Sequence, residues 1–141
     1  MNANTLTLML HIAGLLHLVL MWAGATMPAA VNLRSHLAPL PQFVRRLFYV
    51  YYAFIGLMLA GFGTLTFCCA PELAAGGVLA RSFCCLLVAF WLLRLAAAAF
   101  VFDVRPYLVS GLYRAGYFSI NVIFLYLLGV YALTAWKGGA L

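Results

Sequence analysis

Residues 47–67 read LFYVYYAFIGLMLAGFGTLTF, an apolar run that contains no charged side chain. A helix needs roughly 20 predominantly apolar residues to cross the hydrocarbon core of a bilayer. Only helices and closed barrels satisfy all of their backbone hydrogen bonds within lipid. This run therefore predicts a membrane-spanning α-helix.

Three further stretches meet the same criterion, and they are residues 6–31, 78–102 and 115–136. The composition agrees, because 68% of the residues are hydrophobic and only 7% are charged. Soluble domains average roughly 45–50% and about 25%, and a soluble fold of this composition would expose too much apolar surface. We expect an all-α integral membrane protein in which residues 1–141 form one domain of four transmembrane helices.

The connections between these stretches are short, which makes consecutive helices antiparallel neighbours in a bundle. Pro39 and Pro41 interrupt the first connection, because proline lacks a backbone donor and restricts the residue before it. The first stretch is read as a retained helix, since no positive charge precedes it and it is longer than the apolar region of a secretory signal.

The positive charges predict the orientation, because loops rich in Lys and Arg face the cytoplasm. The first and third connections share one side of the membrane and carry five of these residues, against two on the other side. The five are Arg34, Arg45, Arg46, Arg105 and Arg114, and the two are Arg81 and Lys137. We expect cytoplasmic Arg-rich loops, both termini outside, and location in a bacterial inner membrane.

The two halves of the chain, residues 1–70 and 71–141, resemble each other. Arg34-Ser35-His36-Leu37 aligns with Arg105-Pro106-Tyr107-Leu108 at an offset of 71, and the second and fourth helices align at an offset of 68. Each half would be a two-helix hairpin of the same sense, as in parallel repeats related by an axis along the membrane normal. The pattern predicts a tandem duplication, and chance similarity between Leu-rich helices is the alternative.

The basic residues at the cytoplasmic side are the best candidates for a binding site. Arginine side chains bind phosphate or carboxylate groups through two parallel hydrogen bonds. The alternative is a rim that only sets topology and contains one internal ion pair. The candidate ligand-binding residues are Arg34, His36, Arg45, Arg46, Asp103, Arg105 and Arg114, together with Arg94 inside the third helix.

Arg94 is the most unfavourable residue to place in a membrane. An arginine near the centre of a spanning helix costs about 2.5–3.5 kcal/mol on insertion scales, and such residues usually face the bundle or a cavity. Its side chain either extends to the cytoplasmic headgroups or finds an acceptor inside. The acceptors considered are backbone carbonyls, a neutral His17 and a bound anionic ligand.

The histidines and cysteines predict no metal site. His11 and His17 lie about 120° apart around the first helix, and the other three predicted helices contain no histidine. Haem is therefore disfavoured, and the cofactor, if any, stays unknown. The pairs Cys68-Cys69 and Cys84-Cys85 lack the Cys-x-x-Cys spacing of redox motifs, which separates the chain from the four-helix DsbB and vitamin K epoxide reductase families. We expect these histidines and cysteines to be satisfied or packed within the bundle.

The segment with Trp22-Ala23-Gly24, Pro28, Arg34 and His36 is similar to the start of the HemJ-type protoporphyrinogen oxidases. The similarity covers only the first quarter of the chain, and that family's later basic motif has no counterpart. No function is carried over from it.

Two functions follow from these observations. The chain is predicted first as an accessory or structural subunit of a larger membrane assembly, because small residues recur along the second helix at Ala53, Gly56, Ala60 and Gly63 and such stripes permit close helix contact. The alternative is a small membrane enzyme or binding protein for a lipid, isoprenoid or quinone. Whether it is an enzyme stays open. Expected partners are membrane lipids and other membrane chains or further copies, and not nucleic acid.

Overall fold

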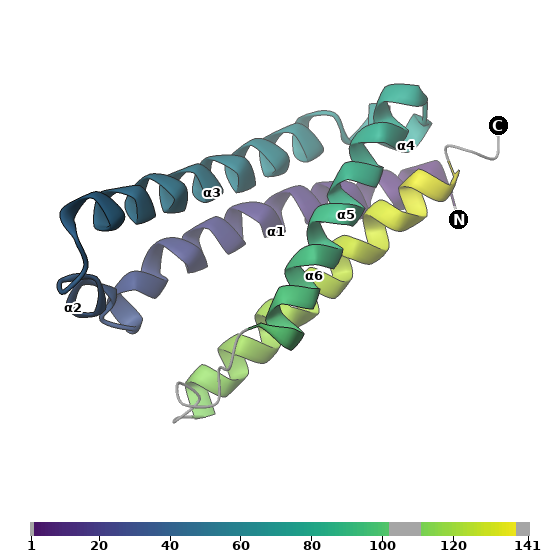
Figure 1. The fold of residues 1–141 in the computed structure, drawn as a ribbon. Coiled ribbons are helices and arrows are strands. Elements are labelled where there is room, and N and C mark those ends of the chain that lie inside the picture. The colour runs from purple at the N-terminus through teal and green to yellow at the C-terminus, as the bar shows by residue number, and fades with distance from the viewer. Residues whose placement is uncertain (1, 102–110, 138–141) are drawn as a thin grey trace.

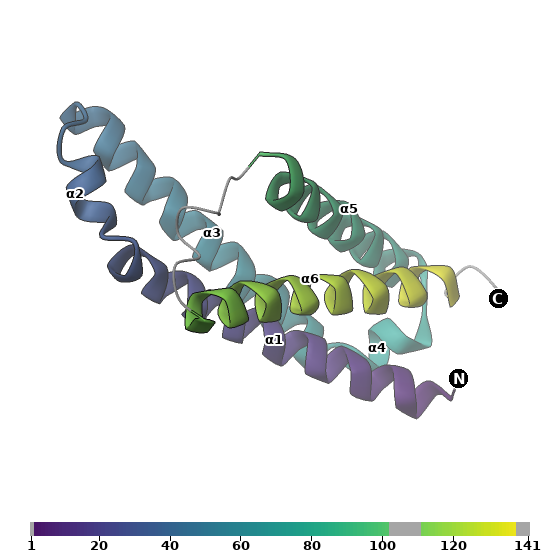
Figure 2. The ribbon, with the colours of Figure 1, turned by 90° about the horizontal axis from the view of Figure 1, so that it is seen from below.

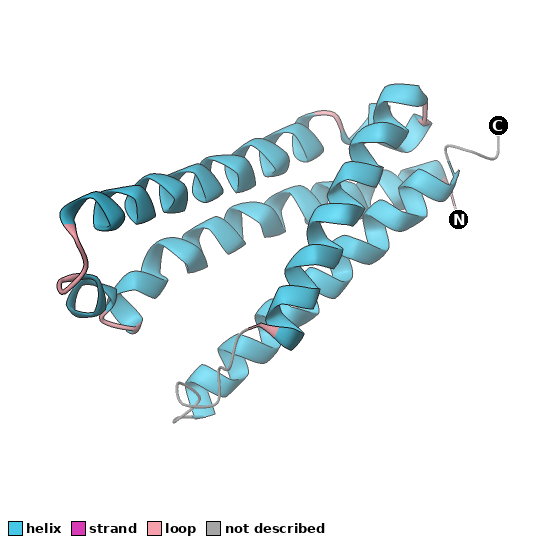
Figure 3. Ribbon diagram, viewed as in Figure 1, coloured by secondary structure: helices cyan, strands magenta, loops and turns pink. Residues whose placement is uncertain are grey.

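The computed structural model describes residues 2–101 and 111–137, and all regular structure in these residues is helical. Four helices are long and apolar enough to cross a membrane, which are α1 (Ala3–Ala30), α3 (Gln42–Cys68), α5 (Val78–Phe100) and α6 (Gly111–Lys137). Two short helices, α2 (Leu33–Leu37) and α4 (Ala70–Ala75), lie between them (Figure 3). The predicted all-α membrane fold is confirmed.

Three helices begin earlier than the apolar runs indicated, and α1 does so by three residues, at Ala3. The sequence placed the start of the second span at residue 47, but α3 begins at Gln42, directly after Pro41. Arg45 and Arg46 therefore belong to the helix and not to the connection, because arginine is a good helix former and only the proline ends the helical segment. Arg114 likewise lies in the first turn of α6.

The first two connections contain helical turns that apolar periodicity did not reveal. In α4, a proline occupies the first turn, where its missing N–H removes no hydrogen bond. This helix ends at Ala75 and is followed by Gly76 and Gly77, whose φ angles of 82° and 135° are readily adopted by glycine. The Cys68–Gly77 connection is thus a compact cap and not an extended loop.

The spanning helices form two antiparallel pairs, α1 with α3 and α5 with α6, and α1 also contacts α4 and α6. Figure 1 shows the pairs meeting near α4 and diverging in the opposite direction, and Figure 2 shows the same molecule turned by 90°. We call the end with α4, where α1 begins and α6 ends, the closed end. The end with α2, where α3 and α6 begin, is the open end.

The close approach of α1 and α3 depends on two glycines. A Cβ atom at Gly14 would lie 2.9 Å from the carbonyl oxygen of Gly63, and one at Gly63 would lie 2.9 Å from Cβ of His17. Both distances are shorter than a normal carbon contact of about 3.5–4.0 Å. Of the small-residue stripe predicted on α3, Gly63 therefore packs against α1. A Cβ at Gly56 would meet nothing within 4 Å.

A proline inside α1 is compensated by a side chain from α3. Pro28 has no N–H, so the carbonyl of Gly24, four residues earlier, loses its helical donor. The Tyr52 hydroxyl donates a hydrogen bond to this carbonyl. Because lipid offers no alternative donor, this contact both satisfies the backbone and ties the two helices together.

Candidate functional site

The predicted basic residues lie at the open end but on both helix pairs. Arg34 and His36 lie on α2, and Arg45 and Arg46 lie near the start of α3. Their side chains are exposed, apart from Arg45, which is half-buried. Arg114 is also exposed, but it lies at the start of α6, which diverges from α3 (Figure 1).

Asp103 and Arg105 lie outside the described residues. The structure therefore groups four of the predicted rim residues on the α1–α3 side and separates Arg114 from them. Their role in binding stays a prediction.

Arg94 on α5 has a partner of a kind that the sequence did not indicate. Its guanidinium carbon lies 5.2 Å from the centroid of the Phe124 ring on α6. A cation over an aromatic face is attracted by the negative face of the ring, and the attraction is stronger outside water. The contact holds the charge between α5 and α6. The partners predicted for Arg94 from the sequence were backbone carbonyls, His17 and an anionic ligand, and did not include an aromatic ring.

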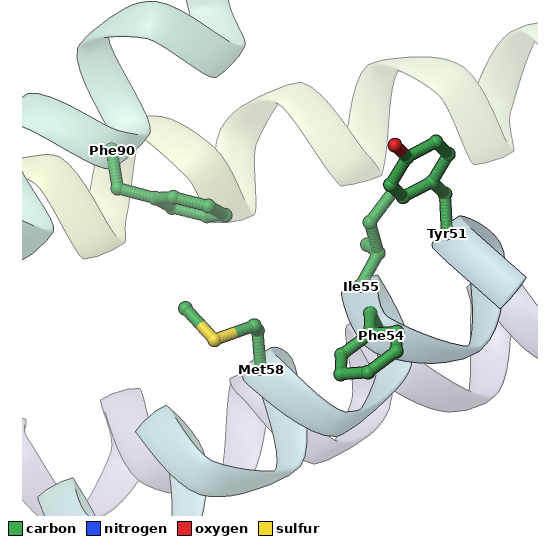
Figure 4. A pocket seen from close by; sticks show the side chains of 5 residues that line it. All are labelled: Tyr51, Phe54, Ile55, Met58 and Phe90. Carbon is green, nitrogen blue, oxygen red and sulfur yellow. The ribbon is translucent and has the colours of Figure 1, made fainter.

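An apolar groove of about 390 Å³ separates the two helix pairs. Figure 4 shows the side chains that line it, Tyr51, Phe54, Ile55 and Met58 from α3 and Phe90 from α5. The α3 residues recur at intervals of three and four, so they share one face of the helix. Phe90 extends across from α5 above Met58 (Figure 4).

Two arginines lie towards the open end from this groove. Arg94 follows Phe90 by four residues on α5, which places both on one face of the helix. On α3, Arg45 precedes Tyr51 by six residues, or about 9 Å of helical rise and about 120° around the helix axis. An apolar chain lying in the groove would thus have cationic groups near one end.

A second polar centre lies where all four spanning helices meet. His17 on α1 is fully buried, and its imidazole contacts aromatic rings edge-on from each of the other three helices. The ring centroids lie 6.4 Å from Phe62 on α3, 5.3 Å from Trp91 on α5 and 5.9 Å from Tyr131 on α6. A hydrogen bond of 2.7 Å between Thr66 and Tyr131 joins α3 to α6 beside it.

The hydrogen bonding of this centre is incomplete. Nδ1 of His17 lies 2.8 Å from the carbonyl oxygen of Ala13. Among residues 2–101 and 111–137, Nε2 of His17 and Nε1 of Trp91 have no hydrogen-bond partner, although both side chains are buried. The prediction that the histidines are satisfied within the bundle is therefore wrong for one ring nitrogen of His17.

The cysteines show different surroundings. Cys84 is fully buried in the core, as expected of a packing residue, whereas Cys68 and Cys85 are exposed and Cys69 is half-buried. All four are free thiols. Within the described part of the chain, no cluster of three or more His, Cys, Asp or Glu side chains could hold a metal ion.

Sequence reasoning missed both the groove and the centre at His17. The groove depends on the angle between two helix pairs, for which the sequence carries no local signal. The centre had one available signal, a histidine in an uncharged spanning segment, since polar residues at such depth mark functional sites by default. No family model, curated protein or solved structure matches this chain, so function is inferred from these sites alone.

Proposed function

We propose that this protein binds one membrane amphiphile, a lipid, isoprenoid or quinone, between its two helix pairs. The observation that carries the proposal is the apolar groove of about 390 Å³ between α3 and α5. This volume falls in the range of roughly 300–1,000 Å³ that is usual for small-molecule sites. The apolar chain would lie along α3, and the head would lie near Arg94 or the start of α3.

The lining of the groove favours a flexible chain over a partner helix. Helices that associate within membranes do so through small residues that let their backbones approach. The groove presents long side chains instead, and those of Tyr51, Phe54 and Ile55 are 61%, 59% and 56% exposed. Such side chains adapt to a chain but keep another helix at a distance.

The charges support an anionic or strongly polar head. Arg94 and Arg45 lie towards the open end from the groove, and arginine pairs well with phosphate and carboxylate groups. The excess of positive charge at this end supports a cytoplasmic orientation. The amphiphile would therefore come from the cytoplasmic leaflet of a bacterial inner membrane.

The accessory-subunit hypothesis remains the second candidate, and the same divergence of the helix pairs supports it. Along α3, large apolar side chains are exposed, such as Phe43 at the open end and Leu57 near the middle of the helix, which are 75% and 66% exposed. A partner chain could cover these side chains, although lipid tails cover them equally well.

Native mass spectrometry of protein released from nanodiscs tests the proposal. Wild-type protein should retain one amphiphile per chain, and Ile55→Trp should lose it because the indole fills the groove. Leu57→Trp is the matched control on the same helix, because Leu57 is exposed but does not line the groove.

Arg94→Gln should lower the retention of amphiphiles with anionic heads more than that of neutral ones. Equal retention by Ile55→Trp and Leu57→Trp would contradict the groove proposal. Recovery of a stoichiometric partner chain without any amphiphile would establish the subunit hypothesis instead.

A further inference from the structure

Two buried groups near the middle of the bundle have complementary hydrogen-bonding needs. Nδ1 of His17 faces the carbonyl of Ala13 at 2.8 Å, and a carbonyl can only accept. Nδ1 therefore carries the proton, and in a neutral imidazole Nε2 is then an acceptor. Trp91 presents the opposite group, because an indole N–H can only donate.

The two nitrogens belong to rings that are direct neighbours in the core and meet edge to face. The His17 and Trp91 rings are 5.3 Å apart, centroid to centroid. Two successive hydrogen bonds through one oxygen atom span up to about 5.8 Å, since each is about 2.9 Å long. Both side chains are at least 99% buried, with exposed fractions of 0% and 1%, so bulk solvent does not satisfy them.

The chemistry of the pair selects the ligand. A carbonyl, ester or phosphate oxygen without a proton could accept from Trp91 but could not donate to His17. An ammonium group could donate to His17 but could not accept from Trp91. A hydroxyl group does both, because it has one donor and two acceptor lone pairs.

We infer that His17 and Trp91 together bind one hydroxyl group, which accepts a hydrogen bond from Nε1 of Trp91 and donates one to Nε2 of His17. Two sources share this chemistry, a water molecule and the head of a lipid alcohol. Phe90 lines the groove and lies 5.2 Å from Trp91, ring centroid to ring centroid. A lipid alcohol in the groove would therefore reach the site past this ring.

The site is distinct from the proposed amphiphile head position near Arg94 and does not depend on it. His17 belongs to the core that all four spanning helices share, whereas the guanidinium of Arg94 lies over the Phe124 ring between α5 and α6. The hydroxyl site can exist even if the groove holds only bulk lipid.

Magic-angle-spinning NMR of ¹⁵N-His and ¹⁵N-Trp protein in phosphatidylcholine vesicles tests the inference, because this lipid carries no hydroxyl head. The Nε2 resonance of His17 should lie upfield of a free acceptor nitrogen, and the indole proton of Trp91 should correlate with a hydroxyl proton. Both observations use the wild-type protein, so they do not depend on the folding of a variant.

Trp91→Phe should move the Nε2 resonance of His17 towards the free value, because the bound hydroxyl loses its donor. The Trp22→Phe control, at a residue that is 68% exposed, should leave that resonance unchanged. His11, whose Nδ1 likewise faces a backbone carbonyl, serves as the internal reference in every spectrum.

Exchange into D₂O and addition of farnesol distinguish the two sources of the hydroxyl, water and a lipid alcohol. Signals present in phosphatidylcholine vesicles and lost by exchange into D₂O identify water. Signals that arise only after addition of farnesol, a short isoprenoid alcohol, identify a lipid alcohol, and either result supports the inference. A free-acceptor resonance in both preparations, unaffected by Trp91→Phe, would overturn it.

Discussion

The closed and open ends of this bundle are built on different contacts. Near the closed end, polar side chains cross between the helix pairs, since Thr66 bonds Tyr131 at 2.7 Å and the Tyr126 hydroxyl donates to the Met9 carbonyl at 3.1 Å. Towards the open end, the two pairs are separated by the apolar groove between α3 and α5. In lipid, apolar burial gives no net attraction between helices, so packing and hydrogen bonds decide where they converge.

The same contrast appears within the α1–α3 pair. At Gly14 and Gly63 the two backbones approach until no Cβ atom fits, whereas a Cβ at Gly24 or Gly56 would meet nothing within 4 Å. The contact at Gly14 and Gly63 is therefore sensitive to added volume, whereas Gly24 and Gly56 tolerate it. Four predictions separate the two regions, in order of decreasing effect.

The largest effect is expected at the glycine contact. Gly14→Ala places a methyl group 2.8 Å from Cβ of Phe67 and 2.9 Å from two backbone atoms of α3. Overpacking of this kind costs about 1–3 kcal/mol, which should appear in reversible unfolding of the protein in bicelles. Gly24→Ala on the same helix is the control and should be neutral or slightly stabilising. Equal stability of the two variants would contradict the close α1–α3 contact.

The hydrogen bond between α3 and α6 should contribute less. Thr66→Val and Tyr131→Phe each remove one partner, and interhelical hydrogen bonds in membranes average about 0.6 kcal/mol with a maximum near 1.7. A double-mutant cycle should give a coupling free energy in this range. The exposed Thr64, changed to Val, should show no coupling to Tyr131→Phe, and similar coupling for both threonines would argue against the contact.

The bond from Tyr52 to Gly24 should matter only while Pro28 is present. Tyr52→Phe leaves the Gly24 carbonyl without a donor and should destabilise by about 0.6 kcal/mol. In a Pro28→Ala background the helix supplies its own N–H to that carbonyl, so the same substitution should have a smaller effect. An identical loss of stability in both backgrounds would mean that Tyr52 does not compensate for the proline.

The smallest effect on stability is expected at the rim. Arg45→Gln with Arg46→Gln should change the unfolding free energy by no more than about 0.5 kcal/mol, as is usual for surface substitutions. The pair should nevertheless weaken the selection of anionic lipids, by about 1 kcal/mol per basic residue, as measured with spin-labelled phosphatidylserine. Arg81→Gln near the closed end is the control. Unchanged lipid selectivity would contradict a role of the basic rim in binding anionic lipids.

The sequence predicted what depends on local composition and failed where geometry between helices matters. The run from Leu47 to Phe67 contains most of α3, because spanning length and lack of charge are local properties. The start of α3 was missed by five positions. The helix continues through polar residues back to Gln42, and Pro41, not the loss of apolarity, marks where it begins. The predicted tandem duplication and cytoplasmic orientation are not tested by this structure and stay predictions.

The candidate sites divide in the same way. Arg94 was identified because a charge in a spanning helix is visible in the sequence, but its Phe124 partner comes from another helix, 30 positions later in the chain. The unsatisfied nitrogen of His17 was not predictable, because its surroundings combine residues from all four spanning helices. The groove likewise exists only because the two pairs diverge.

Distance measurement between the helix pairs in a bilayer tests the central claim most directly. Spin labels on a keto amino acid, which leaves the native cysteines in place, would be introduced in two pairs at exposed positions of α3 and α6. Leu65 with Leu133 reports on the closed end, and Phe43 with Leu112 reports on the open end. Pulsed dipolar spectroscopy should give a short, narrow distribution for the first pair and a longer one for the second. Equal distances, or a shorter distance at the open end, would contradict the account.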